Sequence, residues 1–76
     1  GGENISFEIN ASGVSAESVN FSKGRITEKA SGVSIEVNSE QEIDAAIGAI
    51  RAAGGKLLSV QPIKQSLEEL FVEKTT

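Results

Sequence analysis

The residue types that most often carry out chemistry in proteins are scarce in this chain. It has no cysteine and no histidine, so it lacks the most nucleophilic side chain, the commonest general base and the commonest zinc ligands. A nucleophile would have to be a serine or threonine activated by a lysine or a carboxylate. No serine–lysine motif surrounds any of the lysines, which are Lys23, Lys29, Lys56, Lys64 and Lys74. We therefore expect no catalytic residue and no enzyme activity in this chain.

The carboxylates gather in two short clusters. Glu40, Glu42 and Asp44 form one, and Glu68 and Glu69 form the other. Both clusters fall where the sequence predicts that a helix begins, and acidic side chains there satisfy backbone donors and complement the helix dipole for about 0.3–1 kcal/mol each. This structural role accounts for the clusters without a catalytic function.

Sites for phosphate or metal ions are not evident either. A phosphate-binding loop joins a strand to a following helix, whereas Gly54, Gly55 and Lys56 lie between a predicted helix and a predicted strand. The acidic residues do not have the spacing of a calcium-binding loop. We expect no cofactor-binding and no metal-binding residue in this domain.

Size and charge limit the remaining functions. With 76 residues the chain forms one small domain, and its net charge of −4 argues against nucleic-acid binding. No apolar run approaches the roughly 20 residues that a membrane helix needs, so we expect no direct membrane insertion. A chain with these properties is expected to act by binding.

The first half of the chain predicts three strands and a short helix. Apolar residues alternate with polar ones over residues 5–9, which indicates a strand with one buried face. After Gly13, a helix with Ser15 as its N-cap is predicted to run until Lys23 and Gly24, the glycine suiting a left-handed exit. An edge strand over residues 25–30, a turn at Ser31 and Gly32, and a more central strand over residues 33–37 should form a hairpin.

The second half predicts a helix, a strand and a terminal helix. Ser39 and Glu42 form a capping box at the start of the helix, and Gly54 and Gly55 end it. Between them an apolar stripe at helical spacing is formed by Ile43, Ala46, Ile47 and Ile50. A fourth strand is predicted over residues 56–63. A second capping box, Ser66 with Glu69, then begins a short helix with apolar residues on one side, namely Leu67, Leu70 and Phe71.

These elements together predict an α+β fold of the ferredoxin-like type, with the order βαββαβ, an antiparallel sheet and an additional C-terminal helix. Residues 3–76 are expected to form this single domain. A helix as short as the terminal one has little stability alone, so we expect it to dock on its own sheet. Contact between part of its surface and a partner is the alternative.

The last part of the sequence resembles the C-terminal end of many ABC transporter ATP-binding subunits, of the drug-export and gliding-motility type. Those chains close with a glycine-ended helix, a strand, a proline and a Ser-Leu-Glu-acid-aliphatic-Phe helix. The resemblance covers about a third of the chain. Gln65 departs from it, since the family often has proline there. The motif positions are Ser66, Leu67, Glu68, Glu69, Leu70 and Phe71.

The resemblance implies a non-catalytic accessory domain, a fragment of a longer chain whose ATPase core, with ATP and magnesium, lies upstream. Its partners would be that core, the second ATPase subunit and, indirectly, the membrane-spanning permease, at the cytoplasmic face of the membrane. Whether it regulates ATP turnover or only stabilises the subunit is left open. Leu67, Glu68 and Phe71 carry the match to the motif, and the resemblance implies that they anchor the last helix.

A regulatory module of the ACT type is the alternative function. Such modules share the βαββαβ order and often bind amino acids near the first loop, where residues 10–13 of this chain could offer backbone donors. An ordinary loop between two elements explains those residues equally well.

Overall fold

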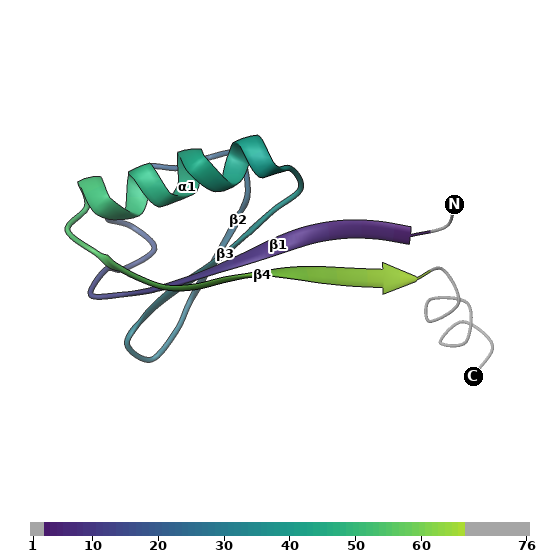
Figure 1. The fold of residues 1–76 in the computed structure, drawn as a ribbon. Helices are drawn as coiled ribbons and strands as arrows, with labels where there is room; N and C mark the ends of the chain where they lie inside the picture. The colour runs from purple at the N-terminus through teal and green to yellow at the C-terminus, as the bar shows by residue number, and fades with distance from the viewer. Residues whose placement is uncertain (1–2, 67–76) are drawn as a thin grey trace.

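The computed structural model describes the backbone of residues 3–66, and the side chains of residues 5–64 within that range. This part of the chain forms one antiparallel sheet with the strand order β2-β3-β1-β4 and one helix on the sheet (Figure 1). The α+β class is therefore confirmed. The elements in chain order are β1 (Glu3–Ser12), β2 (Arg25–Glu28), β3 (Gly32–Val37), α1 (Glu40–Ala52) and β4 (Lys56–Ser66).

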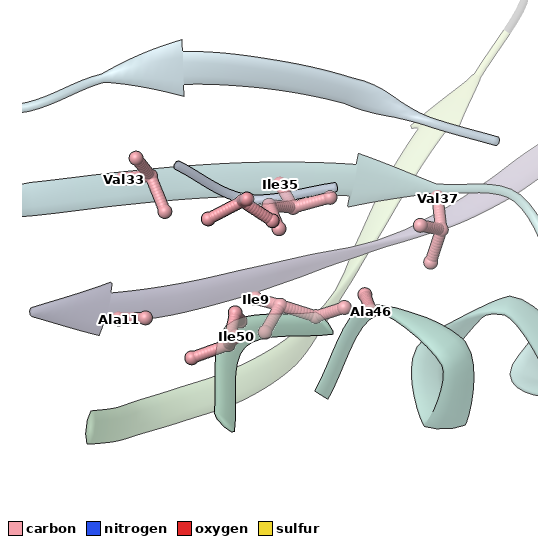
Figure 2. Packing of buried hydrophobic residues seen from close by; sticks show 8 residues of the cluster. Ile9, Ala11, Val33, Ile35, Val37, Ala46 and Ile50 are labelled. Atoms are coloured by element: carbon pink, nitrogen blue, oxygen red, sulfur yellow. The ribbon is translucent and has the colours of Figure 1, made fainter. Parts of the chain in front are cut away.

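The core lies between α1 and one face of the sheet. Alternation along β1 and β3 directs their apolar residues to this face, and Ile9 is paired with Ile35. Figure 2 shows Ile9 close to Ala46 and Ile50 of α1, two residues of the stripe that the sequence predicted. Burying an aliphatic side chain of this size contributes about 1.5–3 kcal/mol. The buried apolar residues are Ile9, Ala11, Val19, Val33, Ile35, Val37, Ala46 and Ile50.

The helix α1 has the ends that the sequence predicted. The Ser39 hydroxyl accepts a hydrogen bond from the Glu42 backbone N–H (3.3 Å), and the Glu42 carboxylate accepts one from the Asn38 N–H (3.0 Å). At the other end Gly54 has φ 85°, and the Gly55 N–H donates to the Ile50 carbonyl (2.9 Å). A left-handed glycine followed by such a backward bond closes many helices.

The helix predicted after Gly13 is wrong. Residues 13–24 form a loop with one short turn, and Ser15 caps nothing: its N–H donates to the Ser18 hydroxyl, which donates back to the Ser15 carbonyl. Small polar residues that bond to nearby backbone in this way compete with helix formation. Val19, only 5% exposed, instead fixes the loop to the core.

Gly24, which was expected to end that helix in a left-handed conformation, has another role. The backbone of Gly24 is not left-handed; among the described residues, positive φ occurs at Gly13 and Gly54. A β-carbon on Gly24 would overlap the Glu36 carbonyl oxygen. Glycine is needed there because the loop passes close to β3.

Two further boundaries differ from the predictions. The turn of the β2–β3 hairpin is centred on Ala30 and Ser31, one residue earlier than expected, and the Lys29 N–H donates to the Gly32 carbonyl (2.8 Å). The strand β4 continues past residue 63 and pairs with β1 as far as Ser66. Pro62 does not end it because β4 is an edge strand, where a missing N–H is tolerated.

The described elements therefore follow the order strand, strand, strand, helix, strand. The βαββαβ order is not present in this part of the chain, because a loop stands where its first helix was predicted. The additional C-terminal helix, predicted from Ser66 onward, lies outside the described residues except for Ser66 itself.

Candidate interaction surface

The strands β1 and β4 form a long two-stranded ribbon that α1 covers only in part. They pair antiparallel from Ser12 and Lys56 at one end to Glu3 and Ser66 at the other. In Figure 1 the ribbon projects well beyond the helix, toward the end formed by Glu3 and Ser66. Within residues 3–66, one stretch of the sheet thus has no helix above it.

On the side that faces α1 farther along, the uncovered stretch carries several apolar residues together with the exposed Lys64, which lies opposite Ile5. Ile9 is fully buried, whereas Ile5, two positions of the same face away from it, is 51% exposed. On β4, Val60 lies opposite Ile9 and is 39% exposed, and Pro62 lies opposite the half-buried Phe7. We call these four residues, Ile5, Phe7, Val60 and Pro62, the apolar ribbon face.

Leu58 is also exposed, at 57%, but it does not belong to this face. The β1–β4 register shifts between Asn10 and Ala11, whose partners are Ser59 and Leu57. Leu58 is the extra residue of the resulting β-bulge, at the far end of the ribbon. It is therefore a matched control for substitutions in the apolar ribbon face.

Both edges of the sheet carry features that oppose the addition of another strand. The outer strand β4 has Pro62, the bulge at Leu58 and a lysine near each end. The outer strand β2 has only four residues and begins with the exposed Arg25. Short strands, bulges, proline and charge all reduce edge-to-edge pairing. A partner is thus expected to dock on a face of the sheet and not on an edge.

The opposite face of the sheet is polar, with Glu8 near its centre. The Glu8 carboxylate accepts hydrogen bonds from the Gln61 side-chain amide (2.8 Å) and from the Ser34 hydroxyl (3.0 Å), which connects β1, β4 and β3. Beside it, the Asn10 amide donates to the Ser59 hydroxyl (3.1 Å). The sequence showed polar alternation in β1, but only the register brings these side chains together.

The environment of Glu8 suits an ionised carboxylate. The pKa of Glu8 lies below its ordinary value of 4.5, first because Gln61 donates to the carboxylate and next because Ser34 does. At neutral pH the group is charged and accepts hydrogen bonds, and it has no proton to donate. The arrangement joins strands and is not that of a general acid.

The residues of the C-terminal motif lie mostly outside the described part of the chain. Ser66 is the last residue of β4 and pairs with Glu3, whereas Leu67, Glu68, Glu69, Leu70 and Phe71 lie beyond the described residues. Because β4 ends there, the motif begins at the same end of the ribbon as the apolar ribbon face.

The first loop, where a small ligand was considered, uses its backbone donors internally. The Gly13 N–H donates to the Ser31 carbonyl (3.0 Å), and the Ala16 N–H donates to the Glu28 carboxylate (2.8 Å). A ligand would have to replace these bonds. The loop geometry gives no support to an amino-acid site.

Metal sites, cavities and membrane spans are the other features that bear on function. Within residues 3–66, no group of three or more acidic side chains is placed to hold a metal ion. A shallow cavity of about 280 Å³ is lined by Gly24, Arg25, Glu36 and Asn38. In the same part of the chain, no helix has both the length and the apolar character of a membrane span.

Comparison with known proteins does not add a relative. No family model, no curated protein and no solved structure matches this chain.

Proposed function

We propose that this chain is a non-catalytic accessory domain at the C-terminus of an ABC transporter ATP-binding subunit. Its role is to support ATP-driven transport through contacts with its own ATPase core or with the second ATPase subunit. ATP and magnesium would bind in the upstream core, at the cytoplasmic face of the membrane, and the permease would be affected indirectly.

The observation that carries this proposal is the apolar ribbon face at the end of β1 and β4. Its exposed residues are Ile5, Val60 and Pro62. Leaving their apolar surface in water costs about 25 cal/mol for each Å² that a partner could cover. The guarded edges favour docking on this face. A domain built in this way is suited to making contacts.

The finer description of the fold is part of the same proposal. In the sheet β3 lies between β1 and β2 and is antiparallel to both, so β1 and β2 run parallel with a crossover between them. In a ferredoxin-like fold a helix makes this crossover. Here residues 13–24 make it, with Val19 in the core beside α1. We interpret the fold as a ferredoxin-like one in which a loop replaces the first helix.

The first test is the coding sequence upstream of residue 3 in the native gene. We expect it to encode a phosphate-binding loop and an ABC signature motif. A gene in which no ATP-hydrolysing portion precedes these residues would contradict the proposal. A metabolic enzyme in that position would instead favour the ACT-type alternative.

The second test is binding between the ATPase core and this domain, expressed as separate chains. We expect the two to co-purify and Val60→Asp to weaken binding about tenfold or more, since a charge would be placed in a desolvated contact. Leu58→Asp, a matched substitution at the other end of the ribbon, should leave binding unchanged. Equal binding by both variants would show that the ribbon face is not the contact.

A further inference from the structure

We propose that the shallow cavity where β2 begins and β3 ends binds a small zwitterion, a molecule such as a free α-amino acid that carries an ammonium and a carboxylate group on one carbon. The cavity volume of about 280 Å³ is near the lower end of the range for ligand pockets and suits a molecule of this size. The cavity lies at the opposite end of β3 from Gly32, which pairs with Ser12 beside the first loop. Binding here is independent of the contacts proposed for the apolar ribbon face.

Opposite charges from neighbouring strands line the cavity. Arg25 of β2 and Glu36 of β3 are direct cross-strand partners, and both line the cavity together with Gly24 and Asn38. Opposite charges in such a pair attract each other, yet within the described residues no hydrogen bond or ion pair joins these two side chains. The Arg25 guanidinium can hold a carboxylate through two parallel hydrogen bonds, and the Glu36 carboxylate can accept an ammonium group beside it.

The charges around the cavity favour a zwitterion over a simple anion or cation. Glu8 of β1 is the cross-strand partner of Glu36 on the other side of β3, so two carboxylates lie near one guanidinium. The Glu8 oxygens already accept hydrogen bonds from Gln61 and Ser34, which leaves Glu36 to meet a ligand. The two carboxylates would repel a phosphate ion, and Arg25 would repel a simple amine. A ligand with both charges is attracted on both sides.

The backbone on both sides of the cavity is held in place. Gly24 passes so close to β3 that a β-carbon on it would overlap the Glu36 carbonyl oxygen, so the chain just before Arg25 has little room to shift. On the other side, the Asn38 N–H donates to the Glu42 carboxylate (3.0 Å) at the start of α1. The side-chain amide of Asn38 offers both a donor and an acceptor. A site whose frame is already ordered loses less entropy when a ligand binds.

Backbone amide NMR of the 76-residue chain tests the site, with free glycine and free glutamine as probes. At least one of them is expected to shift the Gly24, Arg25 and Asn38 signals in a saturable way, with a Kd of about 1–10 mM, because a few charged contacts in an open site bind weakly. Acetate and methylamine, which carry one charge each, are expected to bind about tenfold more weakly or less. Absence of saturable shifts with both amino acids, or equally tight binding of acetate or methylamine, would overturn the proposal.

Substitutions at the two charged positions extend the test. Arg25→Gln and Glu36→Gln are each expected to weaken binding of the amino acid about tenfold, since each removes one of the two charged contacts. The matched controls are Lys29→Gln on β2 and Glu17→Gln on the first loop, which change the same charges outside the lining of the cavity and should bind as the native chain does. The dispersion of the amide signals shows whether each variant is folded. Native binding by Arg25→Gln or by Glu36→Gln would also overturn the proposal.

Discussion

Glu8 and Gly32 show how much single positions decide in this sheet. The carboxylate of Glu8 joins three strands across the polar face. Gly32 pairs with Ser12 at the end of β1, and a β-carbon on Gly32 would overlap the Ala11 carbonyl oxygen. Hydrogen bonding determines the role of Glu8, and the lack of room for a β-carbon determines that of Gly32. Each role leads to a prediction.

Protonation of Glu8 is expected to destabilise the domain. Its folded pKa is lowered, so its contribution is complete above the ordinary value of 4.5 and is lost as the pH falls from there through the folded pKa. The free energy of unfolding, measured with urea at about pH 6 and about pH 3, should fall more between the two pH values for the native chain than for Glu8→Gln. Glu17→Gln, on the loop, is the matched control for removing one carboxylate. A pH dependence that Glu8→Gln leaves unchanged would refute this role.

Replacing Gly32 by alanine is expected to destabilise the protein by about 2–3 kcal/mol, because the backbones of β1 and β3 must separate to admit the methyl group. The control is Gly48→Ala in α1, where a β-carbon meets nothing within 4 Å. There alanine should stabilise the protein by about 0.5–1 kcal/mol through its better helix propensity. If this description of the backbone is correct, urea denaturation shows a lower free energy of unfolding for Gly32→Ala than for the native chain. For Gly48→Ala the free energy of unfolding is higher than that of the native chain.

At the scale of elements, the loop of residues 13–24 does the work that a helix was predicted to do. It spans the crossover from β1 to β2 and sends Val19 into the core formed by α1 and the sheet. Val14, Ala16 and Phe21 pack around that core from the same loop. The loop therefore contributes to stability through a few apolar contacts and not through regular backbone hydrogen bonding.

This role predicts an unequal effect of two valine substitutions. Val19→Ala is expected to cost about 2 kcal/mol, since it leaves a cavity under the loop. Val60→Ala, on the exposed ribbon face, is expected to cost less than about 1 kcal/mol. Chemical denaturation measures both. Similar losses for the two variants would mean that Val19 does not anchor the loop.

At the scale of the whole molecule, the core is small and lies toward one end. The described part of the chain extends over 44 Å in its longest direction, while α1 covers only the portion of the sheet around Ile9 and Ile35. For 76 residues the expected stability is about 4–11 kcal/mol. Shortening a single side chain in the core therefore removes a large share of this stability.

Ile35→Ala is expected to cost about 3–4 kcal/mol, because Ile35 is fully buried at the centre of β3 and the surrounding backbone cannot close the cavity. Leu58→Ala removes a similar volume from an exposed bulge and should cost less than about 1 kcal/mol. Circular dichroism during urea unfolding compares them. If Ile35→Ala lowers the free energy of unfolding no more than Leu58→Ala does, Ile35 does not lie in the core of the protein.

Much of the local structure could be read from the sequence because it depends on neighbouring residues. The alternation in β1 and β3, the caps of α1 at Ser39 and Gly54, and the apolar stripe of that helix are all local patterns, and they were predicted correctly. The central position of β3 also followed from its strongly apolar face. The absence of histidine and cysteine restricted the possible chemistry before any fold was known.

The remaining features depend on contacts between residues far apart in the chain. Residues 13–24 contain both helix signals and competing serines, and burial of Val19 decided in favour of a loop. The length of β4 depended on its partner β1, which continues pairing beyond Pro62. The bonds of Glu8 required the register of three strands. In the part of the chain that the structure describes, the apolar ribbon face extends past α1 because the helix is shorter than the ribbon beneath it. This is a relation between two elements that local patterns do not contain.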